Sequence, residues 1–460
     1  MSQQQRLPLW FLVVNWALLV IAFVSGALLG SRNRAPDLPE PQATALARIH
    51  AEILRSHVDE QDGQALVDRA IAAMVDNLDE YSKYVPPAEL ARYLEHSTGR
   101  YEGVGMLLTQ QGEDLVALFP FAGSAAERAG LRPGDRILAI DGKPVAELPL
   151  ENRSTAATER VRGPAGTTVQ LRIGRGDERL DVTVERAPVQ RQVVKWVHRP
   201  DAEAGIGYLY LSDFHPGAKA AVQAALTGLT AQAPLRALIL DLRFNGGGSL
   251  DECVAIARLF VREGTIVSMR RRDEMLEEYK ADARQCTYPE LPLVVLVNGH
   301  SASASEVLAG ALQDHGRATI VGTRSYGKGF VNTVYSWPDL PLRLKLTTAH
   351  YYTPKGRNID RPHHQHPDGQ PAGPAPTADD TGGIHPDVPI EVAKEQFVAT
   401  MRQLDASEVP EAHREAFAAV ARQFDLPVPG PLQPAADAQL AAALQAAKDR
   451  LASPNGSSGR

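Results

Sequence analysis

The feature that most constrains the fold is an alternation of short apolar runs with helical patterns from Val189 to about Tyr352. The runs are IGYLYL, ALILDL, TIVSM, LVVLV and ATIVG, and the stretches between several of them are AKAAVQAALTGL, LDECVAIARLFV and ASEVLAGALQDH. Branched, continuously apolar runs are typical of strands buried on both faces, and apolar residues repeated at three and four positions are typical of helices. This alternation predicts an α/β core with a buried sheet.

Composition excludes several classes of protein. The chain of 460 residues is long enough for two or three domains, and its 44% hydrophobic content suits globular cores. A net charge of -7, with no long block of like charge, argues against a nucleic-acid binder. The two cysteines, Cys253 and Cys286, make neither a disulfide framework nor a zinc site. Cys253 lies in an apolar helical pattern and is predicted to be a core residue.

The first 34 residues stand apart from the rest. Leu7 to Gly30 carries no charge and is long enough to cross a bilayer as a helix. A cleaved signal has a shorter apolar region and a small-residue cleavage site, of which VSGALLGS is a weak version. We therefore expect residues 1–34 to be a membrane anchor, with a cleaved signal or a buried helix as the alternatives. The stretch APDLPEPQ reads as a linker, and residues 35–98 as linker and helices.

Residues 99–187 have the texture of short strands joined by Gly and Pro turns. SAAERAGLRPGDRILAIDGKPV reads as a short helix that ends at Gly130, a turn, a strand and a tight hairpin turn at DGK. This pattern, continued by VRGPAGTTVQLRI, resembles a PDZ domain. The resemblance implies that the loop YEGVGM holds a peptide carboxylate through Gly103, Val104, Gly105 and Met106, and that a peptide tail adds to the following strand. The alternative is a small β domain without a ligand.

Two segments near the C-terminus carry less information. Residues 361–383 are rich in Pro, Gly, His and Asp and read as an irregular insertion. Its three histidines, His363, His364 and His366, are interpreted as part of a solvated loop rather than a metal site, and we expect neither metal nor cofactor. Residues 393–460 return to a helical pattern and end in the frayed tail SPNGSSGR.

The stretch GHSASASE, residues 299–306, raises the question of a nucleophile. Ser303 with Glu306 forms a capping box that opens a helix, which alone explains both residues. A helix start also favours developing negative charge. A serine nucleophile needs a base, and the candidates are His300, His315, His350 and Lys328 in SYGKGF. None of the histidines has an evident orienting acid.

The segment GTRSYGKG also resembles a phosphate-binding loop. Gly329 stands where such a loop has Ser or Thr for magnesium, and FVNTVYSW follows in place of a helix. We therefore exclude nucleotide binding.

Several long blocks, in order, resemble the carboxyl-terminal processing (tail-specific) serine proteases. The resemblance rests on IGYLYLSDF, ALILDLRFNGGGSLDECVAIARLF, LVNGHSASASEVLAGALQD, VGTRSYGKGFVNTV, LTTAHYYTPKGRNI and GGIHPDVPI. It implies a ClpP/crotonase-like α/β core at residues 188–392, with an inserted PDZ domain and helical N- and C-terminal segments. It implies Ser303 as nucleophile and Lys328 as base. To act near pH 7 the lysine must be buried, and Phe330 and Tyr326 are candidates for its apolar cover.

The resemblance also implies the supporting residues, with two departures. The position four after the lysine is usually glutamine and orients it; here it is Asn332, one methylene shorter. The oxyanion hole is implied to consist of the N–H groups of Gly247 and Ala304. Gly246 stands where the family typically has proline.

The expected function is that of a serine endopeptidase cutting near the C-termini of exported proteins by a Ser-Lys mechanism. The PDZ domain would capture the tail and gate activity. We expect the body on the periplasmic or extracellular side of the inner (cytoplasmic) membrane, held by a single-pass anchor. Expected partners are protein substrates, an activating adaptor and a second copy of the chain, without nucleic acid. An inactive scaffold and a crotonase-like acyl-CoA enzyme are the alternatives; intact Ser303 and Lys328 argue against the first, and the PDZ region and G-K-G lysine against the second.

Overall fold

The computed structural model describes residues 38–271, 274–361, 382–426 and 428–452. The chain divides into two compact units, residues 1–74 and residues 75–460. The described part of the first unit contains helix α2 (Glu40–Ser56) and most of α3 (Gly63–Asp76). No residue of α2 is buried, and the ring of His50 bonds the carbonyl of Gly63 at 3.1 Å.

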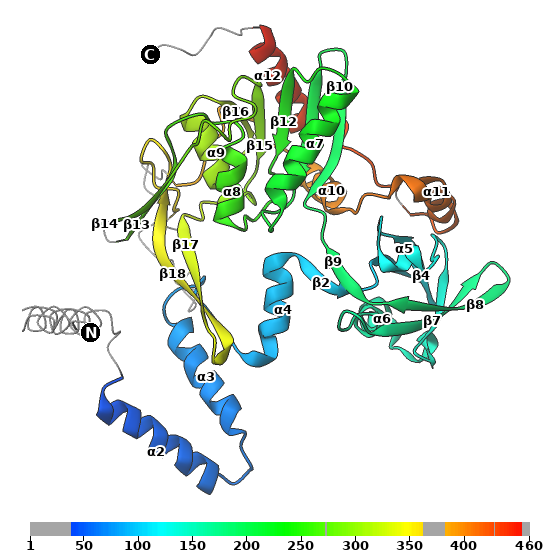
Figure 1. The fold of residues 1–460 in the computed structure, drawn as a ribbon, viewed down its shortest axis with the longest axis vertical. Helices are drawn as coiled ribbons and strands as arrows, with labels where there is room; N and C mark the ends of the chain where they lie inside the picture. Colours follow the sequence, from blue (N-terminus) through cyan, green and yellow to red (C-terminus); the bar gives the residue numbers. More distant parts are fainter. Residues whose placement is uncertain (1–37, 272–273, 362–381, 427, 453–460) are drawn as a thin grey trace, which may run out of the picture. The chain divides into compact units, whose positions relative to one another are not determined.

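A six-stranded sheet forms the centre of the second unit (Figure 1). Its order is β10-β11-β12-β15-β16-β19, and every pair is parallel except β10 with β11. The strands are β10 (Val194–Asp201), β11 (Ile206–Leu211), β12 (Ala237–Asp241), β15 (Leu293–Val297), β16 (Ala318–Gly322) and β19 (Val388–Pro389). The α/β fold predicted from the sequence is confirmed, and four of the five apolar runs form β11, β12, β15 and β16.

Helices cover both faces of this sheet. On one face Leu209 and Leu240 pack with α7 (Ala218–Gln232), α8 (Leu250–Ala257) and α9 (Ala304–Asp314). On the other face Tyr208 and Ile239 pack with α12 (Ala438–Ala452). Because successive strand residues point to opposite faces, these strands are buried on both sides. That burial is the physical reason for their continuously apolar sequences.

A second sheet is antiparallel, with the order β1-β18-β13-β14 and with β17 paired to β18. Its strands are β1 (Lys83–Val85), β13 (Thr265–Arg271), β14 (Glu274–Lys280), β17 (Phe330–Trp337) and β18 (Leu340–Tyr352). The placement of TIVSM in the α/β core sheet was therefore wrong, since this run forms β13. Ile266 and Val267 are fully buried in the cluster that includes α9, so the run looks like a core strand although its partners differ.

The predicted PDZ region contains a six-stranded sheet with the order β3-β4-β5-β7-β8, and β6 pairs with β5. Its elements are β3 (Met106–Gln111), β4 (Asp114–Pro120), α5 (Ala125–Arg128), β5 (Arg136–Ile140), β6 (Lys143–Pro144), α6 (Arg153–Val161), β7 (Thr168–Arg175) and β8 (Glu178–Glu185). Asp141 and Gly142 have φ +48° and +75°, which confirms the tight hairpin turn at DGK. Among the described strands, β3 lies at an edge of this sheet and pairs with β4 alone.

Helix α4 (Pro87–Thr98) and strand β2 (Arg100–Gly103) lead into this region, and β9 (Ala187–Gln190) pairs with β2 on the way out. After the core come α10 (Lys394–Asp405), α11 (Arg414–Gln423) and α12. Helix α11 contacts the PDZ region, because Phe417 packs edge-on against Phe119 with centroids 5.5 Å apart. The ring of His413, just before α11, adds a hydrogen bond with the carboxylate of Glu127 at 2.8 Å.

Several sequence predictions lie outside the described residues. They are the anchor at residues 1–34, most of the insertion at 361–383 with its three histidines, and the frayed tail. Among the residues that the structure describes, no helix is long and apolar enough to cross a membrane. The same residues contain no cluster of His, Cys, Asp and Glu that could hold a metal ion.

Candidate active site

Ser303 stands at the start of α9, just beyond the carboxyl end of β15. Its backbone has φ +56° and ψ -114°, a conformation that residues other than glycine rarely adopt. Strain of this kind is typically about 1–3 kcal/mol and persists only where neighbouring contacts enforce it. The flanking Ser301 and Ser305 are fully buried and donate to backbone carbonyls, whereas Ser303 is half-buried. Of the three serines, Ser303 is the one that is partly exposed.

Glu306 joins the segment that carries Ser303 to the loop that carries Lys328. Its side chain is fully buried, and each carboxylate oxygen accepts two hydrogen bonds. Oε2 accepts the N–H groups of Ser303 and Lys328, both at 2.8 Å. Oε1 accepts the N–H of Gly327 and the hydroxyl of Ser325, both at 2.6 Å. Burial raises the pKa of Glu306 to about 7, while the four donors favour the carboxylate and oppose that shift. Sequence reasoning found the helix cap but not these bonds to the G-K-G loop.

Lys328 lies on the loop between β16 and β17 and is half-buried. Burial lowers the pKa of its amine to about 8; Lys345 adds to this effect, and Glu306 and Glu80 oppose it. The direction is the one a general base requires, because a lower pKa increases the neutral fraction near pH 7. The structure thus supplies most of the shift that a base working near neutral pH needs.

The cover of the lysine differs from the expected one. Tyr326 is 38% exposed, and the ring that faces the amine belongs to Tyr81, whose centroid is 4.8 Å from Nζ of Lys328. Phe330 packs on Tyr81, with centroids 5.4 Å apart. Within the described residues, no hydrogen bond joins the Ser303 hydroxyl to the Lys328 amine. Nothing in the pattern around Tyr81, 247 positions before Lys328 in the chain, pointed to this contact.

Asn332 lies at the start of β17 and bonds away from the lysine. Its amide nitrogen donates to the hydroxyl of Thr347 at 3.1 Å, and that hydroxyl donates to Asp79 at 3.0 Å. The role predicted for Asn332, direct orientation of Lys328, stays a prediction.

The turn that carries Gly247 lies directly against the serine segment. A Cβ added to Gly247, whose φ is +107°, would lie 2.9 Å from both Ala302 O and Ser303 Cβ, so only glycine fits here. The N–H of Ala304 has no acceptor within the described part of the chain. The N–H of Gly247 donates to Oδ1 of Asn245 at 2.9 Å. The two predicted oxyanion donors are thus brought together, and Gly247 must exchange its present bond to serve as one.

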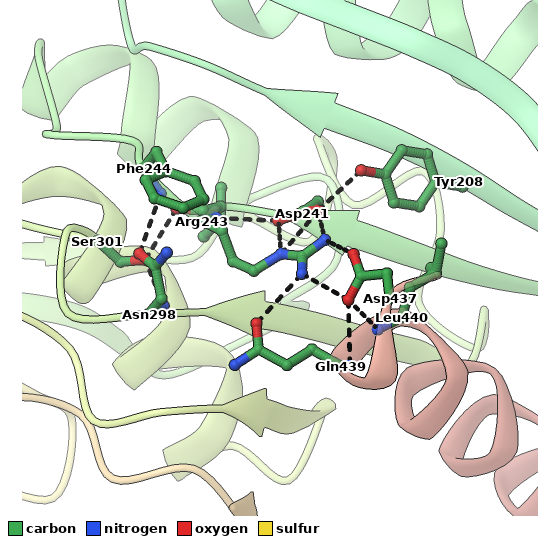
Figure 2. A network of polar contacts seen from close by, with 10 residues as sticks. Tyr208, Asp241, Arg243, Phe244, Asn298, Ser301, Asp437, Gln439 and Leu440 are labelled. Carbon is green, nitrogen blue, oxygen red and sulfur yellow. Dashed lines mark hydrogen bonds and ion pairs between the residues drawn. The ribbon is translucent and has the colours of Figure 1, made fainter. Parts of the chain in front are cut away.

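A buried ion-pair network lies beneath this turn (Figure 2). The guanidinium of Arg243 is 2.7 Å from Asp241 on β12 and 2.8 Å from Asp437, which precedes α12. Its Nη1 also donates to Gln439 at 3.1 Å, and the Tyr208 hydroxyl donates to Asp241 at 2.7 Å. All five side chains are buried. The run DLRFNGGG contains Asp241 and Arg243, but nothing in the sequence indicated partners near residue 437.

This network lies at the start of the turn that carries Gly247. Arg243 is followed by Phe244, whose φ of +61° is again unusual for a residue other than glycine. The N–H of Phe244 donates to the side chain of Asn298 at 3.1 Å, and Asn298 directly precedes the GHSASASE stretch. The C-terminal helix is therefore linked through Arg243 to the residues that flank Ser303.

The three candidate histidines are placed differently from Lys328. His315 caps the C-terminus of α9, and its ring bonds the carbonyl of Thr265 at 2.7 Å. An 11-residue helix is about 16 Å long, so His315 is too far from Ser303 to act as its base. His300 stacks on Phe244 with centroids 5.7 Å apart. His350 lies 3.9 Å from Asp360, a longer separation than a hydrogen bond.

The predicted carboxylate loop connects β2 to β3. The carbonyls of Val104 and Gly105 accept the N–H groups of Ala126 and Phe121 at 2.8 and 2.9 Å. Their own N–H groups have no acceptor among the described residues. A Cβ added to Gly105, whose φ is +74°, would lie 2.6 Å from Ser124 Cβ. These two N–H groups are the donors that the predicted binding of a terminal carboxylate would use, and that role stays a prediction.

A cavity of about 1210 Å³ lies between this loop and the core. Its lining includes the loop residues Gly105 and Met106, then Val161 of α6, and Phe244 and His300, which precede Gly247 and Ser303 in the chain. Ser303 and Lys328 are not part of the lining. The cavity therefore extends from the predicted tail-binding loop to residues near Ser303 without including Ser303 itself.

Comparisons with known proteins agree with this arrangement. The family model "PDZ domain" matches residues 122–186, and "Peptidase family S41" matches residues 205–368. The carboxy-terminal-processing protease of Bartonella bacilliformis is 38% identical over 360 residues, which is 74% of this chain and 80% of that protein. The carboxyl-terminal-processing protease of Synechocystis sp. is 38% identical over 299 residues, 64% of this chain and 68% of that protein.

A solved structure of a photosystem II D1 C-terminal processing protease is 30% identical, with a TM-score of 0.43, and covers 78% of this chain and 91% of that one. The sequence relationship to curated relatives over most of their length confirms the resemblance seen in the motifs and the inserted PDZ domain. The chain belongs to the family of carboxy-terminal-processing proteases, serine peptidases of family S41.

Proposed function

We propose that this peptidase cuts exported proteins near their C-termini through a dyad of Ser303 and Lys328. The observation that carries the proposal is the Glu306 carboxylate, which accepts the backbone N–H of both residues and holds the two segments together. The partial exposure of Ser303 and the lowered pKa of Lys328 support the same assignment.

The chemistry follows the triad logic with lysine as the base. Neutral Lys328 takes the proton of Ser303 as the hydroxyl oxygen attacks the peptide carbonyl. The N–H groups of Ala304 and Gly247 stabilise the developing oxyanion, and the N-terminal end of α9 adds to this field. The ammonium then gives its proton to the leaving amine, and water hydrolyses the acyl-enzyme by the reverse steps.

The PDZ domain captures the substrate tail and gates its access to the core. Support comes from the loop N–H groups of Val104 and Gly105, which can bond a terminal carboxylate, and from β3, to which a peptide can add as a further strand. The cavity that leads from this loop to Phe244 and His300 gives the bound chain a route to the core.

The location and partners are also proposals. The uncharged run from Leu7 to Gly30 supports a single-pass anchor in the inner (cytoplasmic) membrane, with the body on the periplasmic or extracellular side. Protein substrates are the partners of the PDZ domain. An activating adaptor and a homo-oligomer complete the proposed set. Cell fractionation with and without residues 1–34 tests the anchor.

The dyad is tested by cleavage of a fluorogenic peptide with a free C-terminus. Ser303→Ala and Lys328→Ala should each abolish turnover without unfolding the protein, and Ser303→Ala should also abolish labelling by a serine-reactive probe. Ser336→Ala and Lys280→Ala, both at exposed positions, are the matched controls. Loss of activity in His300→Ala, with Lys328→Ala still active, would overturn the proposal. Comparison of cellular C-termini between wild type and Ser303→Ala then identifies the substrates.

A further inference from the structure

The ring of Tyr81 is the group that faces the amine of Lys328. The distance of 4.8 Å from Nζ to the ring centroid lies within the range in which an aromatic face attracts a cation. Such an attraction restricts where the amine can go, and it is stronger where water is excluded, as it is around the half-buried Lys328. Tyr81 is therefore placed to influence both the position and the protonation of the base.

The turn that carries Tyr81 is built around Asp79. One oxygen of Asp79 accepts the N–H of Tyr81 at 2.8 Å and that of Ser82 at 2.7 Å. The other accepts the Ser82 hydroxyl at 2.7 Å. Phe330, two residues after Lys328, packs against the Tyr81 ring, and β1 follows the turn and pairs with β18. The Tyr81 ring is therefore held by the backbone bonds to Asp79, by Phe330 packed against it and by strand β1, which follows the turn.

Asn332 reaches this turn rather than the lysine. Its amide donates to Thr347, and the Thr347 hydroxyl donates to the same Asp79 oxygen that accepts the N–H of Tyr81. The N–H of Thr347 also donates to the Ser82 hydroxyl at 3.1 Å. A continuous set of hydrogen bonds thus runs from Asn332 to the backbone of Tyr81.

Building on the Ser303–Lys328 chemistry proposed above, we propose that Tyr81 is the positioning residue for the Lys328 amine. Asn332 acts on the lysine indirectly, through Thr347 and the Asp79 turn. The side chain of Asn332 is one methylene shorter than glutamine and bonds Thr347. It thereby orients the Lys328 amine through the Tyr81 ring, which the Asp79 turn carries.

Other charged groups also face Lys328 and must stay constant in a test. They are Glu80 of the Tyr81 turn, Glu306 of α9 and Lys345 of β18; Asp360 and Arg361 pack on the neighbouring Gly329 and Gly327. A substitution of Tyr81 leaves these residues in place, but the Tyr81 hydroxyl bonds Glu80, and both Tyr81→Phe and Tyr81→Leu remove that bond. A shift in the pH profile of Tyr81→Leu relative to Tyr81→Phe therefore reports on the ring.

The test is the pH dependence of kcat and kcat/KM for Tyr81→Leu and Tyr81→Phe in the full chain. The rate is expected to rise with pH as Lys328 loses its proton. Because an aromatic face favours the ammonium, Tyr81→Leu should move the midpoint of this rise to lower pH by about half a unit to one unit. Loss of positioning should lower the plateau kcat at least about tenfold, with KM within about twofold, since Tyr81 does not line the cavity. Tyr81→Phe, which keeps the ring, should rescue both quantities.

Two further variants complete the design. Thr347→Val breaks the hydrogen bond from Asn332 and should shift the midpoint of the pH profile in the same direction by a smaller amount. This variant also serves as the test if Tyr81→Leu does not fold. Tyr335→Leu changes a tyrosine of β17 that is 41% exposed and serves as the matched control. Melting temperatures of all variants separate loss of positioning from loss of fold.

Each outcome is decisive. The positioning role is refuted if Tyr81→Leu leaves both the midpoint of the pH profile and the plateau kcat unchanged. It is also refuted if Tyr81→Phe and Tyr81→Leu lose kcat equally, since that result would assign the effect to the hydroxyl. A midpoint that moves to higher pH would show that the ring acts by excluding water, contrary to the inference. If Lys328→Ala itself remains active, the proposed dyad fails. If the dyad is essential and Tyr81→Leu behaves like wild type, only the role of Tyr81 fails.

Discussion

Replacing Asp437 tests whether the C-terminal helix α12 holds the oxyanion turn in place. In the native protein, the carboxylate of Asp437 accepts from Nη1 of Arg243 at 3.0 Å and lies 2.8 Å from Nη2. The same carboxylate caps α12 by accepting the N–H groups of Gln439 and Leu440, both at 3.1 Å (Figure 2). Asp437→Ala removes both functions, whereas Asp437→Asn keeps a good helix cap and removes the charge.

The magnitude follows from burial. Removing one partner of a buried ion pair typically costs about 3–5 kcal/mol. We expect the lower end, about 3 kcal/mol, because Asp241 still neutralises Arg243. Loss of the cap adds about 1 kcal/mol. The free energy of unfolding should therefore fall by about 4 kcal/mol in Asp437→Ala and by about 2 kcal/mol in Asp437→Asn, which loses mainly charge-assisted hydrogen bonds.

The assay is urea unfolding monitored by tryptophan fluorescence. It uses a Ser303→Ala background, which prevents self-digestion. Trp196 is buried in the cluster that contains α12 and reports on this region. The matched control is Asp449→Ala, an exposed position on α12, which should change stability by less than about 0.5 kcal/mol.

With the active serine restored, Asp437→Asn should lower kcat about tenfold and leave KM nearly unchanged, since displacement of oxyanion donors affects the transition state. The reasoning is refuted if Asp437→Ala unfolds at the same urea concentration as Asp449→Ala. It is also refuted if Asp437→Asn keeps full kcat, because the network would then stabilise the fold without positioning the turn.

The remaining predictions concern the site and the tail. Cleavage should rise with pH as Lys328 loses its proton, with a midpoint near its pKa of about 8, and then level off; a profile with its midpoint below pH 6 would contradict lysine as the base. Gly247→Ala should lower kcat about a hundredfold, because the new methyl group would meet Ala302 O and Ser303 Cβ at 2.9 Å, whereas Gly246→Ala, with open space around it, should change kcat less than about twofold; equal kinetics for the two variants would remove Gly247 from the oxyanion hole. A peptide with a free carboxyl terminus should be cut about tenfold to a hundredfold better than its amidated twin, and Gly105→Val should reduce that preference by driving a side chain into Ser124; no preference in the intact protein would refute tail reading.

Much of the fold was predictable because its elements carry local signatures. The buried strands β11, β12, β15 and β16 are continuously apolar, and the helices between them follow the 3.6-residue period. The hairpin turn at Asp141 and Gly142 has the residues that its positive φ angles require. The run TIVSM shows the limit of such signatures, since burial on two faces looks the same in either sheet.

The residues of the candidate site were likewise predictable only where a local sequence pattern identifies them. Ser303, Lys328, Asn332, Gly247 and Ala304 could be named from motifs, because each chemical role demands a residue type within a short pattern. The fourfold bonding of Glu306 could be anticipated only as far as its helix cap. The contacts of Tyr81 with Lys328 and of Asp437 with Arg243 had no signal, since their partners are 247 and 194 positions apart in the chain.

The sequence by itself thus determined the element types, the family resemblance and the residues able to act as nucleophile and base. Only the tertiary structure decided which serine is accessible, how far burial lowers the pKa of Lys328, and that the side-chain amide of Asn332 bonds Thr347 rather than the lysine. The physical reason is that periodicity and turn chemistry depend on neighbours a few residues away. Desolvation, ion pairing and ring contacts depend on groups that meet only when distant segments pack together.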